Sequence, residues 1–448
     1  MLRTVLVANR GEIARRVFRA CRQLGMRTVA VYSEADREAF HVREADEAVA
    51  IGGAPARESY LNSDRILEAA RQARADAIHP GYGFLSENWR FAKAVQDAGI
   101  VFIGPKPDAI RRMGDKIEAR RLMAAARVPI LPGSLTPVAN AAEARRAADE
   151  VGFPIILKAA VGGGGIGMAR VGQEAELQSA FTTAARRAQG AFGSGELYVE
   201  RYLERPRHVE VQVFGDDSGE VVHLHERECS IQRRHQKLVE ESPAPNLPAA
   251  SKAALTSTAV AGARAIGYTN AGTMEFLVDE SGRFYFLEMN TRLQVEHPIT
   301  EEATGLDLVV AQLRVGSGEP LPWRQSEIVQ SRAAVECRVY AEDPTKGFLP
   351  SPGTVSKLAL PSGRGIRIES GIEAGSTVSV HYDPLLLKLV THAATRAQAV
   401  QRMADALDAC VIEGVRTTVP FLRRVITSDE FRQGRVHTQM VEQGAFNA

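Results

Sequence analysis

Cysteine is scarce in this sequence, and the four that are present lie far apart, at Cys21, Cys229, Cys337 and Cys410. No two of them form a CxxC pair, so neither a structural zinc site nor a disulfide framework is expected. Long hydrophobic runs are also missing. The apolar part of residues 1–10 is too short for a signal peptide, and no run reaches transmembrane length. These absences predict a cytoplasmic protein that does not span a membrane.

An excess of charge of either sign is also absent, because the formal net charge is only +1. Such a balance provides no bulk field that would attract nucleic acid or an anionic membrane, and neither is expected as a partner. The phosphate-binding pattern GxxxxGK[ST] does not occur, which excludes a P-loop nucleotide site. The 448 residues, 45% hydrophobic and 24% charged, fit a globular protein with two to four folding units.

The first hundred residues alternate between strand and helix patterns, which predicts an open parallel α/β unit. Expected strands are Thr4–Ala8, Thr28–Tyr32, Ala75–His79 and Ile100–Gly104, and expected helices are Ile13–Leu24, Ser63–Ala73 and Asn88–Ala98. Sheets of this kind bind ligands beyond the carboxyl ends of their strands. The loops Asn9–Glu12 and His79–Glu87 are therefore either ligand-binding surfaces or simple tight turns.

A glycine-rich segment, Gly162–Met168, follows a predicted strand that ends at Lys158. Four successive glycines cost backbone entropy and are favoured where bare amides wrap closely around phosphates. The formal GxGxxG match is accidental, because the expected helix is missing and Met168–Val171 looks extended. The segment predicts a hairpin that folds over a nucleotide, and the alternative is a flexible surface loop.

A second lysine, Lys116, lies in the first turn of a helix that Asp115 is expected to cap. A structural charge at this position is more often acidic, so a bound anion would explain the lysine better. Further along, Glu196–Leu203 reads as a strand entering a linker, which could offer backbone groups to an adenine edge. Paired strands are expected at His208–Phe214 and Glu220–His225.

Two strand-like runs, Thr273–Val278 and Phe284–Asn290, predict a hairpin with the four-residue loop 279–282. Because successive side chains of a strand point to opposite faces, one face should carry Phe284, Phe286, Glu288 and Asn290. If Val278 faces Arg283, Glu275 faces Phe286 and lies on the side of Glu288. Two carboxylates and an amide would then converge, as a hard cation requires. A register slip of one residue would undo this arrangement.

Polar residues of mixed sign follow this hairpin, among them Arg292, Gln294, Glu296 and His297. Arginine binds planar anions through two parallel hydrogen bonds, and glutamate can serve as a general base. The alternative is a solvated loop after an edge strand. A similar choice applies to the run 226–237, whose Gln232, His235 and Lys237 form either part of a site or part of a solvated face.

From Arg332 onward the character of the sequence changes to short β segments, with a strand at Ala334–Tyr340 and a helix at Gln398–Ala409. We therefore predict three domains. Their expected bounds are 1–113 for the N-terminal α/β domain, 114–325 for the central domain with a lid at about 130–203, and 326–448 for a β-rich C-terminal domain.

Together these segments resemble biotin carboxylase, the ATP-grasp subunit of biotin-dependent carboxylases, over essentially the whole chain. The motifs that carry the resemblance are 7–14, 79–88, Met113–Lys116, 233–237, Glu288–Pro298, 341–344 and 349–353. The resemblance implies an N-terminal open parallel α/β domain, a central ATP-grasp domain with a mobile lid and a β-rich C-terminal domain. The motif at Glu288–Pro298 is highly specific, whereas the glycine loop is only supportive.

The resemblance also implies a role for individual residues. Those expected to bind ATP are Lys116 and Lys158 on the phosphates, Gly164, Gly165 and Gly167 in the closing loop, Glu200, Arg201 and Leu203 at the adenine with His208 nearby, and Gln232 and His235 in the pocket wall. Two Mg²⁺ or Mn²⁺ ions would be ligated by Glu275, Glu288 and Asn290. Bicarbonate would be held by Lys237, Arg292, Gln294 and the backbone amide of Val295. Glu296 would be the general base, and Arg338 would stabilise the biotin enolate.

Two positions depart from the family pattern. Ile166 occupies a position in the glycine loop where arginine or lysine is expected, so either the lid lacks one phosphate contact or other amides supply it. Arg201 replaces an expected lysine beside the adenine, which keeps the charge. Neither change removes a catalytic group, but both bear on nucleotide affinity.

The resemblance predicts a homodimer that carboxylates biotin in the first half-reaction of an acetyl-CoA or other acyl-CoA carboxylase, such as that of fatty acid biosynthesis. The sequence has no Met-Lys-Met biotinylation motif, so biotin is expected on a separate carrier protein, and a carboxyltransferase is expected as a further partner. Alternatives are a pyruvate-type carboxylase, another ATP-grasp ligase that joins a carboxylate to an amine, and a nucleotide-binding regulatory protein without turnover.

Overall fold

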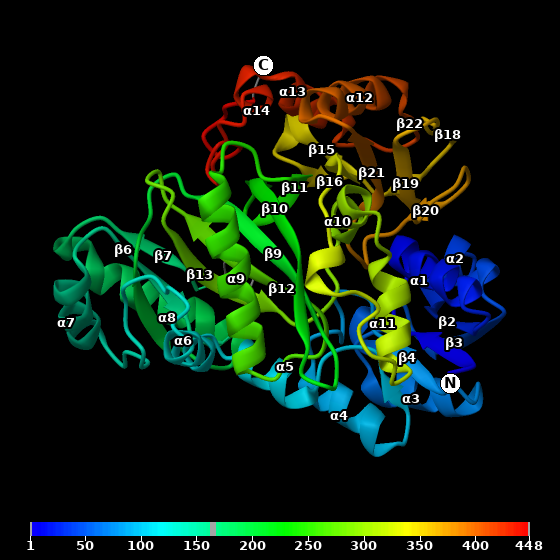
Figure 1. Cartoon of the computed structure of the whole chain (residues 1–448), viewed down its shortest axis with the longest axis horizontal. Helices are drawn as coiled ribbons and strands as arrows, with labels where there is room; N and C mark the ends of the chain where they lie inside the picture. The colour runs from blue at the N-terminus through cyan, green and yellow to red at the C-terminus, as the bar shows by residue number, and fades with distance from the viewer. Residues whose placement is uncertain (1, 162–166, 447–448) are drawn as a thin grey trace.

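The computed structural model describes residues 2–161 and 167–446, which form three units in chain order (Figure 1). The N-terminal unit lies at one end, a small lid projects at the other, and the C-terminal unit continues the long central sheet. The predicted architecture is confirmed at this level. Among the described residues, no helix is long and apolar enough to cross a membrane.

The N-terminal unit contains a fully parallel five-stranded sheet in the order β3-β2-β1-β4-β5, which confirms the predicted open parallel α/β unit. The strands are β1 (Thr4–Val7), β2 (Arg27–Ser33), β3 (Glu47–Gly52), β4 (Ala77–His79) and β5 (Val101–Phe102), and the helices are α1 (Gly11–Gln23), α2 (Phe40–Glu44), α3 (Ser63–Gln72) and α4 (Trp89–Asp97), with 3₁₀ turns η1 (Glu34–Asp36) and η2 (Ala56–Glu58). The edge strand β3 and the helix α2 were not predicted. Because β1 and β4 are neighbours, the loops after them lie side by side.

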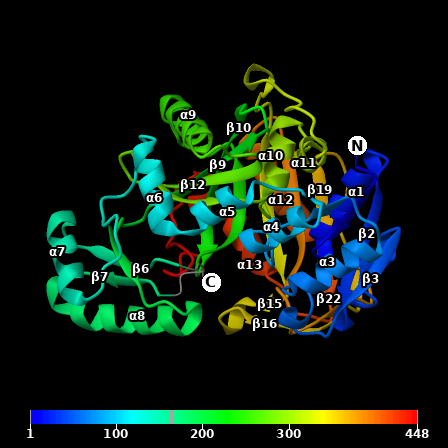
Figure 2. The same ribbon diagram turned by 90° about the horizontal axis from the view of Figure 1, so that it is seen from below.

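Two helices, α5 (Pro107–Gly114) and α6 (Lys116–Ala125), lead into the lid, and Asp115 caps α6 by accepting from two backbone amides as predicted. The lid is a three-stranded antiparallel sheet with two helices and its own apolar core. Its elements are α7 (Ala141–Val151), β6 (Ile155–Ala159), β7 (Ala169–Val171), η3 (Glu174–Glu176), α8 (Leu177–Phe192) and β8 (Leu197–Arg201). Figures 1 and 2 both show the lid projecting away from the rest of the protein.

The glycine loop connects β6 to β7, and residues 162–166, which include Gly164, Gly165 and Ile166, lie outside the described residues. The extended conformation expected after the loop is present, because Ala169–Val171 pairs with β6 as an antiparallel strand. This pairing agrees with a glycine hairpin and not with a dinucleotide-binding turn.

An antiparallel eight-stranded sheet, in the order β13-β12-β9-β10-β11-β14-β21-β19, forms the centre of the molecule. Its strands are β9 (Arg207–Gly215), β10 (Val221–Arg233), β11 (Gln236–Ser242), β12 (Asn270–Val278), β13 (Phe284–Asn290), β14 (Ala333–Tyr340), β19 (Ile366–Ser370) and β21 (Leu385–Ala393). The predicted third unit therefore has no independent main sheet, because its long strands extend the central one. The predicted domain bounds stay a prediction.

The polar run 226–237 lies inside this sheet. The strand predicted to end at His225 continues to Arg233, and most of its charged side chains are buried. The interpretation as a solvated face is therefore wrong for most of the run. Sequence pattern could not reveal this, because the charges are neutralised by partners far away in the chain.

Helices cover both faces of the central sheet. The helix α9 (Ala249–Ala265) packs on β9 and β10, and α10 (His297–Thr304) packs on the opposite face against β10, β14 and β21. The helix α11 (Leu308–Gly316) joins this layer to α1, which docks the N-terminal unit on the sheet. The remaining elements are η4 (Gln325–Glu327), β15 (Glu342–Asp343), η5 (Pro344–Lys346), β16 (Leu349–Pro350), β17 (Gly353–Thr354), β18 (Lys357–Ala359), β20 (Thr377–Val378), α12 (Arg396–Ala409), β22 (Val411–Glu413), α13 (Val419–Thr427) and α14 (Asp429–Arg432).

A buried ion cluster ties the N-terminal unit to the sheet. Glu301 in α10 accepts from Arg16 at 2.8 Å and forms a 2.8 Å ion pair with Arg367, and the Nε of Arg367 donates to Glu369 at 2.8 Å. Burial alone would raise the pKa of both carboxyl groups. The arginines outweigh burial and lower the pKa of Glu301 and of Glu369 to about 2.

These depressed pKa values predict a specific acid dependence of stability. Carboxyl groups whose folded-state pKa is lowered stabilise the fold above their ordinary pKa of 4.5 and lose that contribution as the pH falls towards 2. We expect Arg367→Met to lower the free energy of unfolding by about 3 kcal/mol at pH 7, and the deficit to shrink below pH 4.5. Urea unfolding of both proteins at several pH values measures this.

The control is Arg423→Met, which removes an exposed ion pair with Asp408. Exposed pairs contribute about 0–1 kcal/mol, so this variant should unfold close to the wild type at every pH. A deficit of Arg367→Met that stays constant from pH 7 to pH 3 would contradict the assignment.

Candidate active site

A cavity of about 840 Å³ lies between the N-terminal loops, the lid and the face of the central sheet. Most of the predicted site residues line it, although they come from distant parts of the chain. These are Lys116, Lys158, Arg201, Leu203, His208, Gln232, His235, Lys237, Glu275, Glu288, Asn290, Arg292, Gln294, Val295, Glu296 and Arg338. The fold thus brings the residues of the hairpin and the loop after it together with distant residues that the sequence could connect to them only by resemblance.

Two predicted residues lie behind the cavity wall. The carboxylate of Glu200 is buried and ion-paired with Arg120 and Lys158, so its side chain supports a lining lysine. Gly167 has a φ of +76°, and a Cβ there would come within 3.1 Å of Ala159 and Ala188. Gly167 therefore fits a close approach between the end of the loop and the lid core. The roles of these residues stay predictions.

The hairpin β12–β13 differs from the predicted register in two ways that add up to a shift of two residues at Glu275. Val278 pairs with Phe284 and not with Arg283, which shifts the pairing by one residue, and a β-bulge between Phe286 and Glu288 shifts it again. The two shifts place Glu275 directly opposite Glu288. A bulge can redirect the side chains that follow it, and bulges are common beside active sites.

The bulge also corrects the predicted faces of β13. Phe284 and Phe286 pack into the core with Met289, whereas Glu288 and Asn290 line the cavity. The prediction that Phe284, Phe286, Glu288 and Asn290 share one face is therefore wrong. Period two fails here because the extra residue at the bulge reverses the alternation, and the sequence carries no evident mark of it.

Glu275 and Glu288 differ in protonation tendency, although they are neighbours. Burial would raise the pKa of Glu275, but Lys237 and His208 lower it well below its ordinary value. Burial and the charge of Glu275 raise the pKa of Glu288, against the attraction of Lys116. The two opposed carboxylates form an oxygen-rich donor set, which suits Mg²⁺ or Mn²⁺. The Asn290 amide nitrogen donates to Glu275 at 2.8 Å, and the amide oxygen accepts from Arg292.

Lys237 is the centre of the ionic network. Its Nζ lies 2.5 Å from Glu210, 2.8 Å from Glu275 and 2.6 Å from Glu296, and the side chain is almost fully buried. Burial alone would lower the pKa of Lys237, but the three carboxylates raise it well above its ordinary value. The lysine is therefore a permanent cation that faces the cavity.

Glu296 lies between two cations. It accepts from Lys237, and Arg338 in β14 donates to its second oxygen at 2.9 Å. Burial would raise its pKa, yet Lys237, Arg338 and Arg227 lower it well below the ordinary value. Arg338 also donates to Glu240 at 2.5 Å. Burial raises the pKa of Glu240 to about 7 despite Arg338.

Two long-range contacts hold the loop between β13 and α10. Arg292 donates to Glu87 of the N-terminal unit at 2.9 Å and to the Asn290 side chain at 2.7 Å. The Nζ of Lys388, from β21, donates to the backbone carbonyl of Val295 at 2.8 Å. The second contact fixes the orientation of the backbone next to Glu296. Residues on three units of the fold therefore position this loop.

The N-terminal loops complete one side of the cavity. They were expected to be either ligand-binding surfaces or simple tight turns, and their position in the cavity wall favours the first. Residues Asn9–Ile13 and Tyr82–Phe84 line it. The Asn9 side chain donates to the carbonyls of Pro80 at 2.8 Å and Tyr82 at 2.7 Å, so it ties both loops together. The neighbouring carboxyl ends of β1 and β4 account for this arrangement.

Other residues of the site were missed by sequence reasoning. The C-terminal residues Thr438, Gln439 and Glu442 line the cavity, and Gln439 donates to the Tyr202 hydroxyl at 2.6 Å. Arg227 and Glu210 lie buried behind it. Both belong to alternating strand patterns, in which a charged residue is normally solvated, so no local signal could single them out.

Models of three protein domains match the chain in sequence order. They are "Biotin carboxylase, N-terminal domain" at residues 1–110, "Carbamoyl-phosphate synthase L chain, ATP binding domain" at 115–324 and "Biotin carboxylase C-terminal domain" at 336–443. Together they account for most of the chain. This order agrees with the three units of the structure.

Among known proteins, the chain is 50% identical to "Biotin carboxylase 2" of Bacillus subtilis over 443 residues, which cover 99% of the chain and 100% of the relative. It is also 52% identical to "Biotin carboxylase" of Halalkalibacterium halodurans over 441 residues, which cover 98% of the chain and 97% of that protein. The crystal structure of a Campylobacter jejuni biotin carboxylase–β,γ-ATP complex superposes with a TM-score of 0.97 at 45% identity, covering 99% of both chains. The chain therefore belongs to the biotin carboxylase family, the ATP-dependent ligases that attach a carboxyl group to biotin.

Proposed function

We propose that this chain carboxylates biotin carried by a separate protein, using ATP and bicarbonate, in the first half-reaction of an acetyl-CoA or other acyl-CoA carboxylase. The observation that carries the proposal is the buried arrangement of Lys237, Glu296 and Arg338 beside the Glu275–Glu288 pair. A base held between two cations, next to an oxygen-rich metal site, suits the activation of a small anion by a nucleotide phosphate.

The nucleotide would lie at the lid end of the cavity. Lys116 and Lys158 provide two cations for its phosphates, and Gln232 and His235 line the wall at this end of the sheet. Burial, together with the charge of Lys158, lowers the pKa of Lys116 against the attraction of Glu288. A bound polyphosphate would favour the charged form again. Because Ile166 replaces a cationic residue of the lid, we expect weaker ATP binding than in relatives with arginine or lysine there.

Magnesium or manganese ions would be held by Glu275, Glu288 and Asn290, and would neutralise charge on the transferred phosphoryl group. The chain's own residues would hold bicarbonate on the opposite side of these ligands. Lys237, Arg292 and Gln294 line the cavity there, together with Val295, whose backbone amide would donate to the anion. The positive side chains orient bicarbonate and place its hydroxyl near Glu296.

In the first step, Glu296 accepts the bicarbonate proton while a bicarbonate oxygen attacks the γ-phosphorus of ATP. The bond from phosphorus to the β-phosphate oxygen breaks, which yields carboxyphosphate and ADP. In the second step, carboxyphosphate splits into carbon dioxide and phosphate, and the phosphate takes the proton from biotin N1. The guanidinium of Arg338 stabilises the enolate that forms, and carbon dioxide is captured as carboxybiotin.

The proposal that a separate protein carries the biotin is supported by the full-length match to a relative that is named only as a biotin carboxylase. A homodimer is supported by the biotin carboxylase domain of 2-oxoglutarate carboxylase from Hydrogenobacter thermophilus, whose structure, 46% identical with a TM-score of 0.96, is described as a dimer with MgADP, ADP and bicarbonate. The acyl acceptor is open to alternatives, because relatives of similar identity belong to propionyl-CoA, methylcrotonoyl-CoA and pyruvate carboxylases. A carboxyltransferase subunit completes the proposed assembly.

The decisive measurement is ATP hydrolysis by the purified chain with Mg²⁺, with and without bicarbonate and free biotin. We expect hydrolysis to require bicarbonate and to be stimulated by biotin. Hydrolysis indifferent to biotin would favour a carboxylate–amine ligase, because such an enzyme has no use for the Arg292, Glu296 and Arg338 set. Nucleotide binding without turnover would favour a regulatory protein. Either outcome would overturn the proposed function.

A further inference from the structure

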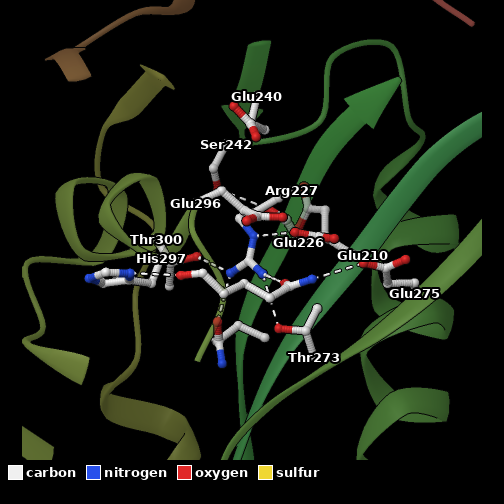
Figure 3. A network of polar contacts seen from close by, with 12 residues as sticks. Glu210, Glu226, Arg227, Glu240, Ser242, Thr273, Glu275, Glu296, His297 and Thr300 are labelled. Carbon is white, nitrogen blue, oxygen red and sulfur yellow. Dashed lines mark hydrogen bonds and ion pairs between the residues drawn. The ribbon is translucent and has the colours of Figure 1, made fainter. Parts of the chain in front are cut away.

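Arg227, in the middle of β10, has no exposed surface and donates through all five of its N–H groups (Figure 3). Its Nε donates to Glu210 at 2.6 Å, and Nη1 donates to Gln212 at 2.7 Å and to Thr300 at 3.0 Å. Its Nη2 donates to Thr273 at 3.1 Å and to Gln294 at 2.5 Å. A guanidinium has five donors and no acceptor, so its hydrogen-bonding capacity is fully used.

Two of these five contacts lead to groups that the proposed function assigns to bicarbonate. The first is the side chain of Gln294 itself. The second is Glu210, which accepts from Arg227 through one oxygen and from Lys237 through the other at 2.5 Å. Arg227 does not line the cavity, so it reaches the anion site only through these neighbours.

The contact to Gln294 decides which way its amide points. Because Arg227 can only donate, the amide atom that faces it must be the oxygen, Oε1. The amide nitrogen is then turned away, and it donates to Glu275 at 2.8 Å. A free glutamine amide can flip between two orientations of similar energy, whereas this one is held in one orientation from both ends.

We propose that Arg227 is a positioning residue for bicarbonate, which orients the Gln294 amide and holds Glu210 against Lys237. The inference rests on the proposed function, because it assumes that Gln294 and Lys237 bind the anion. The guanidinium joins β9, β12, α10 and the loop before α10, so the anion site keeps its shape before substrate arrives. Preorganised donors of this kind do not have to reorganise when an anion binds.

Lysine cannot replace this function, although it preserves the charge. An ammonium group has three donors on a flexible stem and lacks the planar fork that spans several acceptors at once. In Arg227→Lys, the Gln294 amide is released on one side while the positive charge beside Glu210 is kept. We expect the KM for bicarbonate to rise about tenfold or more, with the KM for ATP changed less than about threefold.

The chain offers a matched control with the opposite expectation. Arg120 is also fully buried, donates to Glu200 and to the Leu131 carbonyl at 2.9 Å, and supports the nucleotide lysine Lys158 through Glu200. Arg120→Lys should therefore raise the KM for ATP about tenfold and leave the KM for bicarbonate nearly unchanged. A purely structural role for both arginines would move both constants together in both variants.

The dependence on Gln294 has its own test. If Arg227 acts mainly through that amide, adding Arg227→Lys to Gln294→Ala should raise the bicarbonate KM by less than about threefold further. If the increases in bicarbonate KM caused by the two single substitutions multiply in the double variant, the two residues act independently. That result would overturn the proposal that Arg227 acts through Gln294. If Arg227→Lys does not fold, Thr273→Val removes one acceptor of Nη2 and keeps the guanidinium. We then expect about a threefold rise in bicarbonate KM alone, and an unchanged KM would overturn the proposal.

The wild-type assay is run first, so that the two ideas fail separately. Absence of bicarbonate-dependent ATP hydrolysis in the wild type would overturn the proposed function and this inference with it. Normal wild-type turnover, with bicarbonate KM unchanged in Arg227→Lys, would overturn the positioning role alone.

Discussion

Replacement of Glu296 by glutamine is expected to lower the rate of bicarbonate-dependent ATP cleavage by about 10²–10⁴-fold, the usual contribution of a general base. Glutamine keeps the size and one oxygen acceptor of the side chain, but it cannot take the bicarbonate proton. The protein should stay folded, because Lys237 keeps its contacts to Glu210 and Glu275. Steady-state ATPase kinetics with saturating bicarbonate and biotin measure the loss.

The pH dependence of the wild type gives a second readout of this residue. The pKa of Glu296 lies well below its ordinary value, because Lys237 and Arg338 outweigh the effect of burial. The carboxylate is therefore ionised from pH 6 to pH 9 in the free protein. We expect the pH profile of turnover in this range to be set by groups other than Glu296.

The control for Glu296 is Glu240→Gln, which changes the other carboxyl partner of Arg338 without touching the cavity. Because the pKa of Glu240 is about 7, the wild-type group already carries a proton part of the time at neutral pH. This variant should lose less than about tenfold in rate. Equal losses in both variants would indicate that Glu296 acts only as a counter-ion of Arg338 and not as the base.

Replacement of Lys237 by methionine is expected to have the largest effect on stability. Three buried carboxylates, Glu210, Glu275 and Glu296, share this one ammonium group within 2.8 Å. Removing one partner of a buried ion pair leaves an uncompensated charge and costs about 3–5 kcal/mol. We expect the melting temperature to fall by an amount equivalent to this loss of unfolding free energy, and we expect no detectable turnover.

The stability deficit of this variant should depend on pH in a defined direction. In the wild type, Lys237 lowers the pKa of Glu275 and Glu296, so both carboxylates stabilise the fold above their ordinary pKa. Without the lysine, these pKa values rise, and protonation relieves the repulsion as the pH falls. The deficit should therefore be smaller at pH 5 than at pH 8 when thermal melts of both proteins are compared.

A matched control separates the network from lysine loss in general. Lys252 forms a single 2.9 Å pair with the buried Glu226 outside the cavity. Lys252→Met should retain turnover and show a smaller stability deficit than Lys237→Met. If the two lysine variants lost stability equally, the shared counter-ion role of Lys237 would be contradicted.

The sequence by itself determined much of this protein. Alternation of apolar strands and helices predicted the N-terminal parallel sheet, because buried parallel strands read as short apolar runs. The capping residue Asp115 and the extended segment after the glycine loop were also readable locally. The family was recognised through its resemblance to motifs along the whole chain, of which the motif at 288–298 is highly specific.

Only the tertiary structure decided how the charges are used. The bulge in β13 turns Glu288 and Asn290 into the cavity, and it arises from pairing with β12 and not from the composition of β13. Arg227 is the other case, since its five partners are spread from Glu210 to Thr300. Whether a charged strand residue faces water or a ring of acceptors depends on long-range contacts, and these are absent from the local pattern on which sequence reasoning relies.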